Sequence, residues 1–439
     1  MKKAKIYYYN FPTFANKDEK LAKVKQTKFA NIPFELIKPD KNANWINQTD
    51  NDFDDLLPLC SKDVKRGKSE EAVFQLYCGG YKTNRDEWVF DFEKDNLLNK
   101  VQFFIEKYNN QIESGKIDNE KLDYSIKWSR DLKNKLYKKI KITFNSKKVK
   151  NTELRPFVCK KYYAEKIMSD VLTENHYLIA GKNLDKENTV LTINEGGRLN
   201  LCSLVTNYIP NYSFYVLDAS QSIPLYRYTK EGKKIDNITQ WALNEFRNHY
   251  SVGTHRCVFE IQREDIFHYV YGVLHNPAYR KKYELNLKRE FPRIPFYNDF
   301  WFWSEKGKEL MSLHLNYEEI EKWDVEREEN ILKSGSLNKA KLKAKKEEGI
   351  IILDEQTTLK NIPVIAWEYK LGNRSALEWI LDQYKEKKPR DTTIKEKFNT
   401  YKFEDYKEEV IELLQRVCTV SVKTMEIVGE MEGMNGTRD

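Results

Sequence analysis

The hydrophobic pattern of the chain changes near residue 262, and this change constrains the fold more than any other feature. Between about residues 141 and 259, short β-favouring runs alternate with polar turns. From residue 263 onward, apolar residues instead recur at helical spacing over long segments. Strands and helices that are segregated along a chain are typical of the α+β class. We therefore predict an α+β fold with a β-rich central region, helical flanks and a helical C-terminal part.

The same patterns predict individual elements by residue range. Strands are expected at residues 142–144, 177–179, 190–193, 213–217 and 258–261. Helices are expected at residues 53–61, 94–109, 128–139, 263–275, 279–289, 300–313, 374–387 and 402–428. Residues 317–347 are rich in Glu and Lys, which predicts a solvated helical or flexible insertion, and residues 350–353 predict a lone strand.

The N-terminal segment predicts a strand, a helix and a second strand. Residues 6–9 carry β-favouring aromatic side chains, residues 16–28 follow a helical pattern, and residues 34–37 are again β-like. Such a short unit cannot bury a core of its own. We therefore expect the chain to begin within a domain, with a partial α/β tail. A small ornament on the following domain is the alternative.

Cysteine usage and hydropathy exclude several protein classes. The six cysteines are scattered, with no CxxC pair and no histidine at ligand spacing beside them. This pattern argues against a zinc site and a disulfide framework, and it favours a reducing cytoplasm. No window approaches about 18 uninterrupted apolar residues, so we expect no membrane span.

Motifs for catalysis and cofactor binding are missing. Gly67-Lys68-Ser69 resembles the end of a P-loop, but the glycine required five residues earlier is replaced by Lys62. Gly196-Gly197 lacks the GxGxxG context of a dinucleotide site, and no Asn-Pro-Pro-aromatic tetrapeptide occurs. The six histidines form no ligand motif. The sequence therefore predicts no catalytic, cofactor-binding or metal-binding residue.

Basic side chains form two clusters in a chain whose net charge is +8. Residues 133–150 contain eight lysines and no acid, and a second cluster follows Pro277. Each neutralised phosphate releases counterions, so such clusters favour a nucleic-acid groove. A solvated helix face is the alternative. The candidate phosphate contacts are Lys133, Lys135, Lys138, Lys139, Lys141, Lys147, Lys148, Lys160, Lys161, Arg280, Lys281, Lys282, Arg289 and Arg293.

Polar turns in the β-rich region supply candidate base-reading residues. Arg, Gln, Asn and Ser side chains present donors and acceptors that match base edges in the major groove. For each such residue, a turn cap or a local ion pair is the alternative. The candidates are Asn84, Arg85, Arg198, Ser220, Gln221 and Arg227.

Several stretches, taken in order, resemble one family, the type ISP restriction–modification enzymes. They are Trp45-Ile-Asn-Gln-Thr-Asp-Asn-Asp-Phe53, Thr83-Asn-Arg-Asp-Glu-Trp88, Leu154-Arg-Pro-Phe157, Lys161-Tyr-Tyr163, Thr206-Asn-Tyr-Ile-Pro210, Pro224-Leu-Tyr-Arg-Tyr228, Asp265-Ile-Phe-His-Tyr-Val-Tyr-Gly272, Phe291-Pro-Arg-Ile-Pro-Phe296 and Tyr369-Lys-Leu-Gly-Asn-Arg-Ser-Ala-Leu-Glu-Trp379. They cover almost the whole chain, and the ordered set is specific although each stretch is weak. Residues 219–223 depart from the Gln-Cys-Phe type of run that we expect there.

The resemblance implies a domain organisation and a function. Residues 1–80 correspond to the end of an adenine methyltransferase domain, and residues 81–439 to the target-recognition domain, with a mixed α/β part to residue 262 and a mainly helical part from residue 263. The expected role is recognition of a double-stranded DNA sequence. The nuclease, motor and methyltransferase motifs lie upstream in the family, so S-adenosylmethionine, ATP and Mg²⁺ would bind there and not to this chain.

Two alternatives remain open within this resemblance. The chain is expected to act in the cytoplasm as a split subunit beside a separately encoded methyltransferase, helicase and nuclease portion, or to be a gene remnant. A protein–protein interaction module of the same complex, without independent DNA binding, is the rival function. Autonomous enzymatic activity is not expected.

Overall fold

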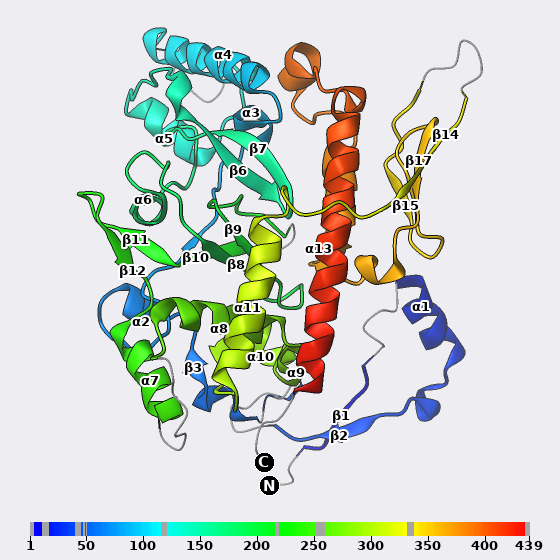
Figure 1. Cartoon of the computed structure of the whole chain (residues 1–439). Coiled ribbons are helices and arrows are strands. Elements are labelled where there is room, and N and C mark those ends of the chain that lie inside the picture. The colour runs from blue at the N-terminus through cyan, green and yellow to red at the C-terminus, as the bar shows by residue number, and fades with distance from the viewer. Residues whose placement is uncertain are drawn as a thin grey trace. The chain divides into compact units, whose positions relative to one another are not determined.

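A computed structural model gives the fold of the chain. The structure describes residues 4–10, 17–39, 45–46, 49, 51–115, 121–215, 219–251, 260–331 and 338–434. The chain divides into two compact units, Met1–Asp55 and Leu56–Asp439. Figure 1 shows the chain and labels many of its elements.

The N-terminal unit contains the predicted order of strand, helix and strand. Strand β1 (Ile6–Tyr8) precedes helix α1 (Lys17–Gln26), and strand β2 (Glu35–Ile37) follows. The two strands pair antiparallel, with Ile6 opposite Ile37. Two 3₁₀ turns, η1 (Phe29–Asn31) and η2 (Asp52–Asp55), complete the unit.

The central sheet of the larger unit is antiparallel and almost entirely buried. Its strand order is β4 (Cys78–Gly79), β10 (Ala219–Pro224), β8 (Val190–Glu195) and β9 (Ser203–Thr206). Nearly every residue of β8, β9 and β10 is buried, on both faces of the sheet. The strand predicted at residues 190–193 is therefore confirmed. Strand β4 lies just before residue 80 and belongs to this sheet. The domain boundary predicted at residue 80 stays a prediction.

A second antiparallel sheet carries a tight hairpin that the sequence did not predict. Strand β6 (Val149–Arg155) pairs with β7 (Val158–Tyr163), and the short β5 (Phe90–Asp91) pairs with the other edge of β7. The hairpin turn places Phe157 at φ +59°, although its side chain is only 1% exposed. Pro156 suits the preceding turn position, and the ring of Phe157 packs edge-on against Tyr317 at 5.1 Å. Core packing thus stabilises a backbone conformation that phenylalanine rarely adopts.

The third sheet corrects two predictions. Strands β14 (Glu326–Glu329), β17 (Thr357–Lys360), β16 (Ile350–Ile352) and β15 (Lys343–Lys345) form an antiparallel sheet in that order. The predicted helical or flexible insertion at residues 317–347 is therefore wrong, since β14 and β15 lie within it. The strand predicted at residues 350–353 is confirmed as β16, but it pairs with β15 and β17 and is not alone. Ile351 and Leu359 are fully buried beneath the sheet. The charged strands β14 and β15 thus depend on apolar side chains from a later segment.

The remaining strands form two-stranded ribbons. They are β11 (Tyr226–Tyr228) with β12 (Lys234–Asp236), β13 (Arg293–Ile294) with β3 (Leu57–Pro58), and β18 (Lys370–Leu371) with β19 (Arg374–Ser375). The helices are α2 (Lys62–Lys65), α3 (Asp86–Val89), α4 (Lys94–Glu113), α5 (Arg130–Tyr137), α6 (Glu174–Ala180), α7 (Gln240–Ser251), α8 (Arg263–His275), α9 (Pro277–Lys282), α10 (Glu284–Leu287), α11 (Phe300–Leu315), α12 (Ala376–Tyr384) and α13 (Lys407–Gly433). Shorter turns are η4 (Ser146–Lys148), η5 (Val364–Trp367), η6 (Ile394–Phe398) and η7 (Phe403–Tyr406).

Several helix predictions are confirmed and several local predictions are wrong. Helices α4, α5, α8, α11, α12 and α13 occupy the predicted segments, whereas residues 279–289 form parts of two short helices. The predicted strand at 177–179 lies inside α6, which Thr173 and His176 cap reciprocally. Residues 142–144 form no strand, and residues 213–215 form a turn. The predicted helix at 53–61 is interrupted by Pro58 in β3. Residues 216–217 and 258–259 lie outside the described residues, and 260–261 form no strand.

Two hydrophobic clusters make up much of the core in the described part of the larger unit. One joins α3, α4, α5 and the β6–β7 hairpin around Trp88 and Phe104. The other joins α12, α13 and the third sheet around Trp379 and Leu414. The α+β class is confirmed, with most of the helical residues after residue 262. None of the helices in the described part of the chain has both the length and the apolar character that a transmembrane span requires.

Helices α8 and α11 approach each other closely because glycines face each other at their crossing. A Cβ atom added to Gly307 would lie 1.8 Å from the carbonyl oxygen of His268, and one added to Gly272 would lie 2.4 Å from that of Trp303. Both partner atoms belong to the backbone and cannot rotate away. The crossing therefore requires glycine at both positions.

We expect Gly307→Ala to lower the free energy of unfolding by about 3 kcal/mol, because overpacking of a tight contact costs this much. Thermal unfolding of the full chain measures the loss. Gly429→Ala is the control, since a Cβ atom there meets nothing within 4 Å in the exposed part of α13. That variant should be neutral or up to about 1 kcal/mol more stable. Equal effects of the two substitutions would contradict the close crossing.

Candidate nucleic-acid interface

The first basic cluster begins on helix α5, whose amphipathic pattern sets the direction of its lysines. Ser129 caps the helix by accepting a hydrogen bond from the Leu132 backbone, and Leu132 and Leu136 are fully buried. The basic residues therefore lie toward the surface. Lys135 is already engaged within the protein, because it forms an ion pair with Asp131 and donates to the carbonyl of Lys166 at 3.1 Å.

The turn after α5 presents Lys139 in an unusual conformation. Lys139 has φ +53°, the left-handed region that usually holds glycine at the end of a helix. Its backbone N–H donates to Leu136, and the N–H of Ile140 donates to Lys135 at 3.1 Å. The turn is thus a Schellman-type helix end, and Lys138 and Lys139 are both exposed on it.

A groove beyond this turn collects lysines from segments that are distant in sequence. Its volume is about 420 Å³, and the acids in its lining are Glu165 and Asp185. Glu165 is paired with Lys148. We call the five lysines of this lining the lysine groove; they are Lys147, Lys148, Lys150, Lys166 and Lys182. An adjoining groove of about 400 Å³ shares Lys150 and adds Lys186.

The lysine groove joins predicted and unpredicted residues. Lys147 and Lys148 were predicted as phosphate contacts, whereas Lys166 and Lys182 reach the groove through the turns that follow β7 and α6. Two other predicted lysines lie apart from it. Lys141 forms an ion pair with Glu113 at 2.7 Å, and Lys133 lines a separate groove with Arg390. The linear run of lysines therefore identifies only part of this surface.

The second basic cluster lies at the other end of the larger unit. Figure 1 shows α5 and the β6–β7 hairpin near one end of this unit, and α9 and α10 near the opposite end. Arg280 and Arg293 are half-buried and donate to the backbone oxygens of Leu274 and Leu56. Lys281, Lys282 and Arg289 are exposed. The two clusters therefore lie apart and do not line one groove.

Three of the candidate base readers lie inside the fold. Arg85 is 1% exposed and pairs with Asp170 at 2.9 Å, while it also donates to the carbonyl of Met168. Ser220 is fully buried in β10 and donates to the carbonyls of residues 211 and 212. Gln221 is 8% exposed and donates to Glu195 at 2.5 Å. These contacts match the structural alternative, so we leave the three residues out of the interface.

The other three candidates lie at or near the surface. Arg198 is exposed on the turn at Gly196–Gly197, whose backbone contacts the carbonyl of Lys288. Asn84 is exposed with φ +54° and donates to Asp170 at 2.5 Å. Arg227 is half-buried and donates to the carbonyl of Asp236 at 3.2 Å.

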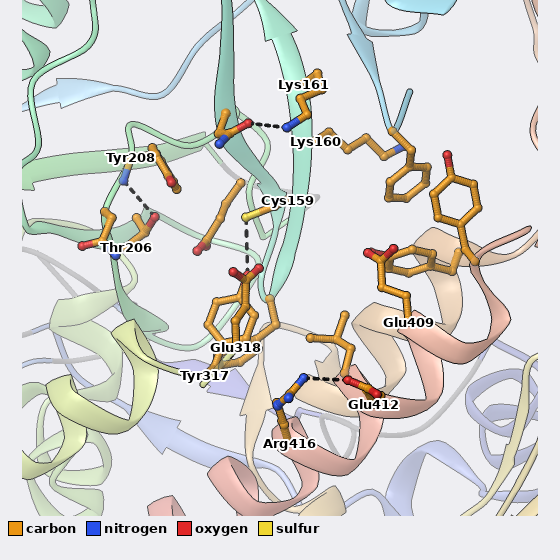
Figure 2. Close-up of a pocket in the computed structure, with 18 of the residues that line it drawn as sticks. Cys159, Lys160, Lys161, Thr206, Tyr208, Tyr317, Glu318, Glu409, Glu412 and Arg416 are labelled. Carbon is orange, nitrogen blue, oxygen red and sulfur yellow. Dashed lines mark hydrogen bonds and ion pairs between the residues drawn. The ribbon is translucent and has the colours of Figure 1, made fainter. Parts of the chain in front are cut away.

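A larger cleft, of about 670 Å³, lies between the β6–β7 hairpin and helix α13. Figure 2 shows Cys159, Lys160 and Lys161 on the hairpin wall and Glu409, Glu412 and Arg416 on α13. Its lining holds five glutamates against four basic residues. Lys160 and Lys161, both predicted as phosphate contacts, face this mixed cleft. Its charge makes it a poorer match for DNA than the lysine groove.

Desolvation dominates the electrostatics of this cleft. Burial raises the pKa of Glu153 to about 8, with the nearby carboxylate of Glu318 adding to the rise against a hydrogen bond from Thr206. Burial lowers the pKa of Lys160 to about 8, and its ammonium group lies 4.0 Å from the ring centroid of Phe92. At pH 7 the Glu153 carboxyl group is therefore mostly protonated and neutral, whereas Lys160 stays mostly charged and loses its proton only as the pH rises through about 8.

No metal or phosphate-loop geometry accompanies these surfaces. Among the described residues, no three His, Cys, Asp or Glu side chains are grouped so that they would hold a metal ion. The Gly67 turn ends helix α2 instead of starting a helix, and its N–H donates to the carbonyl of Val64. His275 is buried and hydrogen-bonds to the carbonyl of Tyr271. The absence of a cofactor site remains a prediction for the chain.

Comparison with known proteins decides the family. The model of the "Type ISP C-terminal specificity domain" matches residues 72–413. The chain belongs to this family. The specificity domain is similar to the solved DrdV–DNA complex, with 41% sequence identity over 97% of this chain and a TM-score of 0.87. No match was found among curated proteins.

Two further solved structures resemble the specificity domain. A nuclease-deletion mutant of the Type ISP restriction-modification enzyme LlaGI, in complex with a DNA substrate mimic, has 29% identity over 97% of this chain and a TM-score of 0.76. The ATP-dependent Type ISP enzyme LlaBIII, bound to DNA, has 26% identity over 98% and a TM-score of 0.78. The chain covers 43%, 39% and 28% of the DrdV, LlaGI and LlaBIII chains, respectively. The resemblance seen in the sequence is thus confirmed.

We expect Glu153→Gln to stabilise the specificity domain increasingly as the pH rises. A carboxyl group whose pKa is raised on folding contributes most below the pKa of the unfolded chain, and its contribution is lost as the pH rises through about 8. The difference from the parent should be small at pH 4 and reach a few kcal/mol at pH 8. Thermal unfolding across this range measures it. Glu70→Gln, at an exposed position, controls for the change in net charge; a constant difference for Glu153→Gln contradicts the assignment.

Lys139→Gly should raise the free energy of unfolding by roughly 0.5–1 kcal/mol, because glycine adopts the left-handed conformation without a Cβ clash. Lys138→Gly is the matched control, since Lys138 has φ −81° and gains nothing from glycine. That control should be destabilised. Denaturant unfolding of the two variants measures both effects, and a loss of stability in Lys139→Gly would refute the strain at this turn.

Proposed function

We propose that this specificity domain recognises a double-stranded DNA target for a restriction–modification system. One observation carries the proposal: the chain matches the DNA-bound DrdV structure over 97% of its length at 41% identity. Two further relatives were also solved with DNA or a DNA mimic. A shared binding mode is the simplest reason for such extended similarity.

The lysine groove is the part of the domain best suited to hold phosphates. It combines Lys147, Lys150 and Lys182. Helix α5 contacts this lining through Lys135, which donates to the carbonyl of Lys166, and Lys138 and Lys139 are exposed where α5 ends. Asp185 and the already paired Glu165 are the acids of its lining. A phosphate backbone along this surface would release counterions without selecting a sequence.

Sequence would be read by polar side chains on turns beside the backbone contacts. Arg198 is our first candidate, because arginine forms bidentate hydrogen bonds with guanine in the major groove. Asn84 and Arg227 are the other candidates; Asn84 donates to Asp170, and Arg227 donates to the carbonyl of Asp236. To read a base, Asn84 or Arg227 would have to replace its hydrogen bond within the protein by one to the base edge.

Methylation and cleavage would belong to other domains. The chain spans less than half of each of the three similar enzymes. We propose that a methyltransferase portion acts beside this domain, where it would flip the target adenine out of the stack. S-adenosylmethionine, ATP and Mg²⁺ would bind to such portions, and the complex would work in the cytoplasm, where the target DNA lies.

Replacing Lys138, Lys139 and Lys147 together with Ala should weaken binding to all duplex sequences alike. The slope of log affinity against log salt concentration should decrease by up to about 2.7, which is 0.9 for each of three phosphate contacts. Fluorescence anisotropy with random and related duplexes at several salt concentrations measures both quantities. All three side chains are exposed in the structure.

The matched control replaces Lys339, Lys341 and Lys343 with Ala. These exposed lysines lie at or near β15, on the other side of α13 from the β6–β7 hairpin (Figure 1). The control should keep the parental slope. Equal effects of the two triple variants would show that net charge alone drives binding. A parent that binds no duplex at low salt would favour the rival function, a protein–protein interaction module.

A further inference from the structure

A second pocket lies where α8 ends and α9 begins, far from the lysine groove. Its volume is about 460 Å³, and it is lined by these two helices, by the 369–372 segment and by α13. Three side chains of its lining have hydrogen-bonding groups that the fold satisfies only in part: Arg280, His275 and Tyr369. None of these three residues lines the lysine groove.

Arg280 supplies a cation without a carboxylate partner among the described residues. Its Nε donates to the carbonyl of Leu274 at 2.6 Å, and one Nη donates to Ser203 at 3.2 Å. These bonds fix the guanidinium group but use only part of its five donors. The groups that raise its pKa against the effect of burial are Cys202 and three tyrosines, and no Asp or Glu is among them.

His275 and Tyr369 each bury an unpartnered polar atom beside this cation. Their side chains are 3% and 5% exposed, and neither His275 Nε2 nor the Tyr369 hydroxyl has a hydrogen-bond partner among the described residues. His275 Nδ1 lies 2.9 Å from the carbonyl of Tyr271, so Nδ1 carries the proton and Nε2 presents a lone pair. A buried polar atom without a partner is costly, which makes two in one pocket informative.

The charges around the pocket favour an anion at its inner end. Lys281, Lys370 and Glu368 are exposed on the lining. Glu284 is half-buried there and forms an ion pair with Lys288 at 2.6 Å. Arg280 lacks a carboxylate partner among the described residues, and it is more buried than Lys281, Lys370 and Glu368. Low-dielectric surroundings strengthen its attraction for an anion.

We propose that this pocket binds hydrogen phosphate or a similar oxyanion that still carries a proton. The anionic oxygens would accept hydrogen bonds from the guanidinium group of Arg280 and the hydroxyl of Tyr369. The P–OH group would donate to Nε2 of His275. This arrangement satisfies the three side chains at once, and it is independent of the proposed DNA binding.

The proposal predicts selection between two ions of similar size. At neutral pH phosphate retains a proton, whereas sulfate has none to donate to His275. Phosphate should therefore bind to the full chain about tenfold more tightly than sulfate, the factor that one unmade buried hydrogen bond is worth. Calorimetric titration at constant ionic strength, without DNA, measures both affinities.

Tyr369→Phe should weaken phosphate binding about tenfold while leaving the thermal stability of the free chain unchanged or higher, because it removes an unpartnered hydroxyl. Tyr108→Phe is the control, since its hydroxyl donates to the carbonyl of Ile140 far from the pocket. The triple Lys138, Lys139 and Lys147 variant should keep the parental phosphate affinity, which separates this pocket from the lysine groove. Equal binding of sulfate and phosphate, no binding of either, or full phosphate affinity in Tyr369→Phe would overturn the proposal.

Discussion

The arrangement of the helical half depends on the close crossing of α8 and α11 at Gly272 and Gly307. With no side chains between them, the two backbones come near enough for Tyr271 on α8 to hydrogen-bond to His314 on α11 at 2.6 Å. His314 in turn bonds to Thr424 on α13 at 2.9 Å, and Tyr271 accepts from the backbone of Val205 in β9 at 3.2 Å. Burial lowers the pKa of His314 to about 3, so this chain of bonds stays neutral. These hydrogen bonds thus fix the positions of α8, α11 and α13 relative to one another and to the central sheet.

The β6–β7 hairpin connects this framework to the candidate interface. Phe157 at its turn packs into the cluster that contains α12 and α13, while Tyr162 near its other end packs into the cluster around α4. Because both ends of the hairpin are packed into the core, the surfaces beside the hairpin are held in fixed positions. The lysine groove begins at one side, and the larger cleft with Glu153 and Lys160 opens at the other. A surface that binds a stiff polyanion benefits from such support, because ordering costs then fall mainly on the lysine side chains.

The sequence predicted long helices better than sites, for a physical reason. Segments such as residues 263–275 repeat apolar residues at helical spacing, so their pattern and their burial agree. Residues 177–179 look like a strand in isolation, but a cap at Thr173 places them in a helix. The strands at 326–329 and 343–345 are charged, and they join a sheet only because the first pairs with residues 357–360 and the second with the apolar strand at 350–352. Such pairing depends on residues that a local pattern does not contain.

Site residues were harder to predict because a charge pattern does not state which charges are already used. Arg85 and Arg280 look like surface cations in the sequence, yet in the fold each donates a hydrogen bond to a backbone carbonyl. Lys166 and Lys182, which belong to no run, reach the groove because turns place them there. Arginine suits such contacts with backbone carbonyls since its fork bonds several acceptors at once, whereas lysine keeps a compact, hydrated charge on a flexible stem. A surface made almost wholly of lysine would therefore hold phosphates without fixing register, and that task would pass to the fewer arginines, such as Arg198, that stay exposed.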